Sequence, residues 1–225
     1  EVGSYFSIIK AIAAGNHKLS AIAAVLEVKS TNLTKYLKTL MDLDILERRV
    51  PVTEENPEKS KRGLYKIKDN YLRFWFAFIY PNMSFIESGH SGIVMDKIRK
   101  GLTTSHIGFV YEDICQERMW ELNVNNAWPF QFSKLGGYWD AKNEIDIAAL
   151  DPEGKNLILG ECKYWKEPVG LNVLHALETK ACDVAWERDR RKVWYVLFSI
   201  SGFSDELRNH AATRDDLLLI DDGER

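Results

Sequence analysis

The feature that most constrains this chain is a hairpin pattern in its second half. Two apolar segments, Glu144–Leu150 and Leu157–Lys163, have the length and alternation of β-strands. Between them stands Asp151-Pro-Glu-Gly-Lys155, with Pro and Gly where a tight reversal needs them. If Asp151 pairs with Asn156 around a four-residue loop, the strands are antiparallel and their register is set.

That register places Asp146 directly opposite Glu161, and directly opposed side chains share a face at about 5 Å between Cβ atoms. Lys163 lies on the same face, because strand side chains alternate, and Cys162 points the other way as a buried thiol. Two opposed carboxylates repel each other and lose hydration among apolar neighbours. A divalent cation such as Mg²⁺ or Mn²⁺ would relieve this conflict, with the lysine beside a phosphate. A purely structural ion-pair cluster is the alternative.

The rest of the second half predicts an α/β layer around a mixed sheet. Helical or strand periodicity gives the order αβββαβαβ. The helices are expected at 107–122, 171–186 and 204–212, and the strands at 129–134, 144–150, 157–163, 193–200 and 217–220. Glu178 and Lys180 on the second helix are secondary candidates for the site, and Tyr138, Trp139 and Trp165 beside it are expected to pack.

The first half predicts a winged helix-turn-helix. Helical spacing marks 5–13, 19–26 and 30–41, and two strands at 46–52 and 64–67 enclose a polar loop. A recognition helix and wing of this kind would contact DNA through the following side chains: Ser30, Thr31, Asn32, Thr34, Lys35, Lys38, Lys61 and Arg62. Glu54, Glu55 and Glu58 in the loop favour the alternative, a protein-contact module.

The expected domains are a winged helix-turn-helix with a following aromatic helix (1–80), a linker (81–105) and a second domain (106–225). The aromatic helix is expected to end before Pro81 and to be covered on several sides, since its rings exceed what one helix face holds. The linker is placed where Gly and Ser recur between apolar segments.

The motif Ile145-Asp146, followed by Glu161-Cys162-Lys163, resembles that of the PD-(D/E)XK nuclease superfamily, with Ile145 where Pro usually stands. The resemblance implies a restriction-endonuclease-like αβββαβ domain. It implies that Asp146 and Glu161 hold the metal with the carbonyl of Cys162, and that Lys163 assists hydrolysis. A Glu on the preceding helix is a usual companion, and Glu112 fits that place.

Nearly the whole chain also resembles the C-terminal part of archaeal and bacterial AAA+-type ATPases, through segments such as TNLTKYLKTLMDLDILERRVPV, GLYKIKDNYLRFWFAFIYPN, LGGYWD and GECKYW. In those proteins an ATPase domain precedes a winged helix and a nuclease-like domain. This chain contains no GxxxxGK[ST], so no ATP site is expected in it. The opening Glu1 in place of Met suggests a fragment of a longer protein.

Composition narrows the class of protein to which the chain can belong. The 225 residues hold 45% hydrophobic and 28% charged residues, which is typical of a globular protein, with no membrane-length apolar run and no signal peptide at the opening residues. Cys115, Cys162 and Cys182 lack CxxC spacing, so we expect neither a disulfide framework nor a zinc knuckle, and a cytoplasmic location. Residues 1–80 carry excess Lys and Arg and the remainder excess Asp and Glu, which fits a nucleic-acid reader joined to a metal site.

Three functions stay open. The first is a metal-dependent DNA phosphodiesterase attached to an ATPase. The second is a non-catalytic nucleic-acid-binding module, and the third is a regulatory domain of an ATPase. DNA is the expected partner, together with the chain's own ATPase domain if it is a fragment. RNA and a homo-oligomer also stay open.

Overall fold

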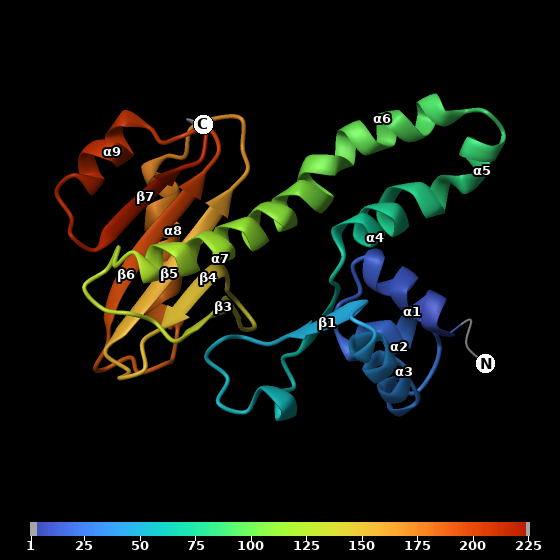
Figure 1. Ribbon diagram of the computed structural model, residues 1–225, viewed down its shortest axis with the longest axis horizontal. Helices are drawn as coiled ribbons and strands as arrows, with labels where there is room; N and C mark the ends of the chain where they lie inside the picture. The colour runs from blue at the N-terminus through green and yellow to red at the C-terminus, as the bar shows by residue number, and fades with distance from the viewer. Residues whose placement is uncertain (1–3, 224–225) are drawn as a thin grey trace. The chain divides into compact units, whose positions relative to one another are not determined.

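The computed structural model describes residues 4–223, apart from the side chains at positions 4, 104 and 105. The chain forms two compact units (Figure 1). The first contains the residues up to Val50 together with Asn56–His106, and the second contains Pro51–Glu55 and the residues from Ile107 onward. Residues 1–3 lie outside the described residues. The expected absence of a signal peptide is read from these opening residues.

The first unit begins with three helices and a strand pair. These elements are α1 (Ser4–Ala13), α2 (Leu19–Val25), α3 (Ser30–Asp42), β1 (Leu46–Arg49) and β2 (Leu64–Ile67), close to the predicted ranges. The strands are antiparallel, and Leu46 faces Ile67. β1 is shorter than predicted, because Pro51 has no N–H and the N–H of Val52 donates to the Gly137 carbonyl at 3.0 Å within the second unit.

The helices of the first unit enclose an apolar core. Ile8, Ile12, Ile22, Leu37 and Leu40 are each at most 2% exposed, at the helical spacing from which the three helices are predicted. The core extends into the aromatic segment through Phe76, which packs with Phe6 and Tyr80.

The aromatic segment continues past Pro81 instead of ending there. It consists of α4 (Asn70–Phe74), a π-helical turn η2 (Trp75–Ile79), a 3₁₀ turn η3 (Tyr80–Asn82) and α5 (Met83–Glu87). Pro81 is accommodated because it stands in the first turn of η3, where its missing N–H costs little.

The stretch predicted as a linker, 81–105, is mostly helical and is grouped with the first unit. α5 is followed by α6 (Ser91–Leu102) and a π-helical turn η4 (Thr103–Ile107). Asn82, which is 7% exposed, helps to hold this stretch in place. It donates to the Phe78 carbonyl at 2.8 Å and accepts from Lys97 Nζ at 2.7 Å. Ser91 and Gly92 belong to the first turn of α6, so they do not mark a loop.

The second unit has the predicted element order. It contains α7 (Gly108–Val124), β3 (Lys134–Trp139), β4 (Glu144–Leu150), β5 (Asn156–Lys163), α8 (Leu171–Asp183), β6 (Lys192–Ser199), α9 (Asp205–Ala211) and β7 (Leu217–Asp221). The five strands pair in the order β3-β4-β5-β6-β7. β3, β4 and β5 are mutually antiparallel, whereas β5, β6 and β7 are parallel, which confirms the predicted mixed sheet.

Helices cover both faces of this sheet (Figure 1). α7 packs on one face, where Met119 meets side chains such as Ile147, Ile158 and Phe198. α8 packs on the other, where Leu174 and Leu177 meet Ala148, Leu159 and Leu197, with α9 adding Leu207. Strand alternation therefore assigns each residue of β4 and β5 to an α7 face or an α8 face.

The strand predicted at 129–134 is wrong: β3 starts only at Lys134. In the segment before it, the buried Phe132 is held outside the sheet because the side chain of Asn123 satisfies its backbone. Asn123 Nδ2 donates to the Phe132 carbonyl at 3.1 Å, and Asn123 Oδ1 accepts from the Phe132 N–H at 3.0 Å. Trp128 and Phe132 fill the core on the α7 face.

We expect Asn123→Ala to lower the free energy of unfolding of the second unit by about 2 kcal/mol, since the backbone N–H and carbonyl of the buried Phe132 both lose their partner. Urea denaturation followed by circular dichroism measures the change. Gln131→Ala is the matched control, because Gln131 is exposed and its only described bond is a 3.5 Å contact with Asn126. Equal stability of the two variants would contradict this account.

Candidate functional site

The predicted hairpin register is confirmed along β4 and β5. Leu150 faces Leu157, and the pairing continues to Ile147 opposite Gly160. The turn is closed by the Asp151 N–H, which donates to the Asn156 carbonyl at 3.2 Å. The Asp151 carboxylate also accepts from the Lys155 N–H at 3.1 Å and from Asn156 Nδ2 at 2.6 Å. The turn residues thus hold the register from which the site is predicted.

A β-bulge interrupts β4 at Asp146. Gly136 on β3 faces Ala148, but Tyr138 faces Ile145, so two residues of β4 stand opposite Gly137 alone. The bulge explains why Ile145 packs on the α8 face together with Ala148, three residues away. The described pairing with β5 stops at Ile147, so Asp146 lies just beyond the regular ladder.

Asp146 reaches β5 through its side chain instead. Its Oδ2 accepts from the Cys162 N–H at 2.8 Å and lies 3.6 Å from Lys163 Nζ. Lys163 Nζ also forms a short ion pair with Glu161 Oε2. These three side chains are 16%, 18% and 7% exposed, so the structure brings the predicted acid–lysine set together in a mostly buried position.

Lys180 on α8 joins this set and completes the acid–lysine cluster of Asp146, Glu161, Lys163 and Lys180. Its Nζ donates to Glu161 Oε1 at 2.6 Å and to the Glu144 carbonyl at 2.7 Å. The sequence places Lys180 on the following helix only as a secondary candidate. Its position one helical turn beyond Leu177, which is fully buried against the sheet, is the signal that could have raised its rank.

The charges in the cluster influence one another. Burial raises the pKa of Asp146 to about 6, and the nearby charge of Glu161 adds to this, while Lys163 opposes it. Burial alone would lower the pKa of Lys163, but the carboxylates of Asp146 and Glu161 outweigh burial and raise it. The two acids therefore repel each other and share positive charge.

The donor set suits a hard divalent cation. Asp146 and Glu161 supply carboxylate oxygens, and Mg²⁺ is commonly held by one or two carboxylates with the rest of its shell filled by water. The described bonds of Asp146 use Oδ2, which leaves Oδ1 as a ligand atom. Both oxygens of Glu161 bind lysines, so a cation would take the place of one ammonium group.

Glu112 stays a prediction as a member of the set. It lies on α7, which covers the face of the sheet opposite Lys180, and its charge is one of several causes, after burial, that raise the pKa of Cys162. Within residues 4–223, no three His, Cys, Asp or Glu side chains are placed to hold one metal ion. The acids for which the structure gives contacts within the cluster are Asp146 and Glu161.

The other residues near the site divide into packed and exposed groups. Glu178 pairs with Arg214 at 2.5 Å and points away from the cluster. Tyr138 is buried, and its hydroxyl donates to Asp140 Oδ2 at 2.9 Å. Trp165, expected to pack, is 47% exposed, and Lys163 Nζ lies 5.6 Å from the centroid of its ring.

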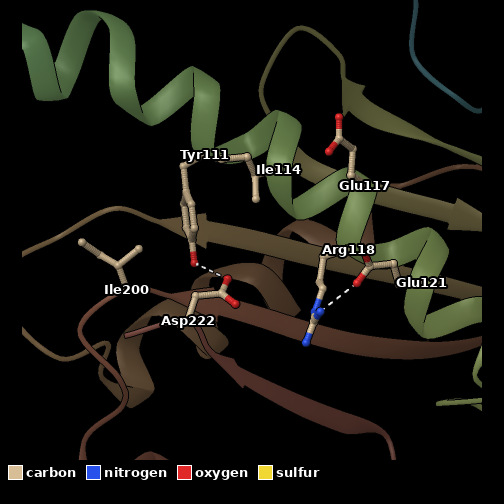
Figure 2. Close-up of a pocket in the computed structure, with 7 residues that line it drawn as sticks. All are labelled: Tyr111, Ile114, Glu117, Arg118, Glu121, Ile200 and Asp222. Atoms are coloured by element: carbon tan, nitrogen blue, oxygen red, sulfur yellow. Dashed lines mark hydrogen bonds and ion pairs between the residues drawn. The ribbon is translucent and has the colours of Figure 1, made fainter. Parts of the chain in front are cut away.

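A separate cavity of about 300 Å³ lies on the α7 side of the second unit (Figure 2). The Tyr111 hydroxyl donates to Asp222 Oδ2 at 3.0 Å across it, and Arg118 pairs with Glu121 at 2.7 Å. None of its lining residues belongs to the acid–lysine cluster. Its lining carries one cation, Arg118, against the three carboxylates of Glu117, Glu121 and Asp222.

In the first unit, the side chains predicted to contact DNA lie on α3 and in the loop between β1 and β2. Those on α3 other than Ser30 are exposed, as are Lys61 and Arg62. Ser30 is the first residue of α3, and Lys29 occupies the cap position without a side-chain bond.

Fold and site together define an α+β protein whose five-stranded mixed sheet carries a buried acid–lysine cluster. Residues 75–181 match a family described as "Archaea bacterial proteins of unknown function". An uncharacterized protein of Methanocaldococcus jannaschii is 41% identical over 167 residues, which cover 74% of this chain and 37% of that protein. The chain thus spans little more than a third of that relative's length.

Among solved structures, the crystal structure of a repair endonuclease from Pyrococcus abyssi is similar, with 13% identity and a TM-score of 0.30. The match covers 46% of this chain and 44% of that one. A TM-score this low carries no argument about function. No described helix is long and apolar enough to cross a membrane.

Proposed function

We propose that the second unit is a divalent-metal-dependent phosphodiesterase that acts on DNA. One observation carries the proposal: Asp146, Glu161 and Lys163 meet at a bulge in the sheet, mostly buried and within ion-pair distance. Bulges occur preferentially next to active sites, where they redirect a side chain. Buried like charges are costly unless they bind something, so the cluster is expected to have a function.

The proposed ligands of Mg²⁺ or Mn²⁺ are the carboxylates of Asp146 and Glu161, with the backbone carbonyl of Cys162. A bound metal ion would supply Lewis-acid polarisation of a phosphate oxygen and an acidified water. The Cys162 N–H fixes the orientation of the Asp146 carboxylate at 2.8 Å. Lys163 places a cation where negative charge develops on the phosphate, and Lys180 holds Glu161 in position from α8.

We further propose that the first unit is a winged helix that directs the enzyme to DNA, with α3 as the recognition helix. The exposed polar and basic residues of α3 and of the β1–β2 loop support this role. In a longer protein, an attached ATPase domain would be its partner. That part of the proposal rests on the family resemblance.

A second candidate is a non-catalytic DNA-binding module. The observation that favours it is that both carboxylate oxygens of Glu161 already form ion pairs, one with Lys163 and one with Lys180. If neither lysine releases Glu161, the cluster is a structural ion-pair network and the fold would bind DNA without cutting it.

Cleavage of plasmid and single-stranded DNA in the presence of Mn²⁺ separates the two candidates. We expect Asp146→Asn and Lys163→Met to lower the cleavage rate at least about 100-fold, since each removes a group that binds metal or stabilises charge. Lys155→Ala is the matched control, because Lys155 pairs with Glu153 on the exposed turn of the same hairpin. It should cleave as the wild type does.

A second measurement, Mn²⁺ binding followed by electron paramagnetic resonance, should show weaker binding by Asp146→Asn and no change with Lys155→Ala. Equal cleavage by the wild type and both site variants would reject the nuclease. Salt-dependent DNA binding without cleavage, unaffected by Asp146→Asn, would establish the non-catalytic module.

A further inference from the structure

The first unit contains a cavity of about 370 Å³. It lies between the start of α2, the start of α3 and the β1–β2 strand pair with its loop. The residues that line it are Lys18, Leu19, Ser20, Ser30, Arg48, Ser60, Lys61, Gly63 and Tyr65. They come from segments distant in sequence, so the fold itself assembles this cavity.

The charge of the cavity is entirely positive. Lys18, Arg48 and Lys61 line it, and no Asp or Glu is among the lining residues. In the part of the chain that the structure describes, none of these three cations is ion-paired with a carboxylate. A cleft lined by one sign of charge raises the local concentration of the opposite ion, so three cations without a carboxylate around one cavity favour an anionic ligand.

Arg48 is held rigidly in the wall. Its Nη1 donates to the Pro57 carbonyl at 2.8 Å and its Nη2 to the Ser60 carbonyl at 2.5 Å. The guanidinium lies against Gly63, where an added Cβ would come within 2.4 Å of Arg48 Nε. A guanidinium has five N–H donors, so these two bonds leave others to bind a ligand from a fixed position.

Hydroxyl groups complete the lining. Ser20, Ser30 and Tyr65 supply donors beside the three cations, and Ser60 Oγ accepts from the Arg62 N–H at 3.1 Å. Cations together with hydroxyl donors, without a carboxylate, are the groups that recognise phosphate oxygens. The volume exceeds what one bare ion fills, which favours a phosphate carried on a larger molecule.

We propose that this cavity binds the phosphate group of a phosphate ester, with Arg48 as the fixed anchor and Lys18 and Lys61 as flexible clamps. The source of the phosphate is a nucleotide or the backbone of a nucleic-acid strand. The site does not depend on the proposed nuclease, because every residue in it belongs to the first unit.

The test uses the full chain and three probes: inorganic phosphate, adenosine monophosphate and a fluorescent DNA oligonucleotide. Calorimetry measures the first two and anisotropy the third. We expect Lys61→Ala and Lys18→Ala each to weaken binding about 5–10-fold, and to reduce the salt dependence of DNA binding by about one ion. Lys59→Ala is the matched control, since Lys59 is exposed in the same loop but does not line the cavity.

Gly63→Ala provides a second variant that removes no charge. It should displace the Arg48 guanidinium and weaken binding as well, while circular dichroism verifies that the unit remains folded. Phosphate and nucleotide binding that the cavity variants weaken identifies a nucleotide site. Binding of DNA alone, weakened by the same variants, identifies a strand-phosphate site.

No binding of any probe by the wild type, or equal effects of Lys61→Ala and Lys59→Ala, would overturn the proposal. DNA cleavage and binding of phosphate or adenosine monophosphate are separate measurements, so loss of cleavage in Asp146→Asn and loss of phosphate binding in Lys61→Ala are separate outcomes.

Discussion

Replacing Glu161 with Ala is expected to lower the free energy of unfolding of the second unit by about 3–4 kcal/mol. Glu161 is 5% exposed and bridges two ammonium groups, Lys163 on its own strand and Lys180 on α8. Its removal would leave Lys180 without a carboxylate partner in a poorly hydrated position. Lys163 would retain Asp146 at 3.6 Å, which places the loss toward the lower end for a broken buried pair.

Urea denaturation of the wild type and Glu161→Ala measures this loss directly. Glu153→Ala is the matched control, because Glu153 and Lys155 form the same kind of pair, two residues apart on the same hairpin, but are 67% and 70% exposed. Its effect should stay within about 0.5 kcal/mol, as for exposed ion pairs in general. Similar effects of the two substitutions would mean that the cluster is far more hydrated than its burial indicates.

The second large effect is expected at Gly160. An added Cβ there would lie 2.6 Å from Val196 Cγ1 and 2.9 Å from the Val196 carbonyl oxygen on β6, which is backbone that cannot turn aside. We expect Gly160→Ala to destabilise the second unit by about 2–3 kcal/mol through forced separation of β5 from β6. The site residue Glu161 follows directly, so the cluster should loosen as well.

Gly136→Ala is the comparison for this substitution. Gly136 lies in β3 of the same sheet, and its added Cβ would meet only Val52 at an ordinary 3.5 Å. Its thermal midpoint should remain close to that of the wild type, because a strand gains rather than loses from Ala in place of Gly. A Gly160→Ala protein as stable as Gly136→Ala would refute the close β5–β6 approach.

The hairpin was predictable because two local signals agree. The apolar segments of β4 and β5 mark two strands, and the Pro-Glu-Gly turn between them sets one register, which Asp151 closes with its own side chain. The proximity of Asp146, Glu161 and Lys163 follows from this register. Helical spacing likewise predicted α1, α2 and α3, whose apolar stripes need no tertiary information.

The errors arise where side-chain hydrogen bonds and ion pairs, which no local pattern reports, decide the structure. Asn123 satisfies the backbone before β3 in place of a strand, and Asn82 with Lys97 orders the segment read as a linker. Lys180 reaches Glu161 across the sheet–helix interface, which no local pattern reports. Glu112 was assigned by family resemblance and stays a prediction; its helix packs on the face opposite Lys180.

The bulge in β4 has a consequence for how this strand can change during evolution. Ile145 and Ala148 face the same layer although they are three residues apart, so Asp146 is the supernumerary residue of the strand. Loss of its single codon would restore an unbroken alternation with every apolar neighbour still in its own layer. Homologues could therefore lose Asp146 without changes in the core. Where Asp146 is retained, we expect the reason to be the ligand that its carboxylate binds.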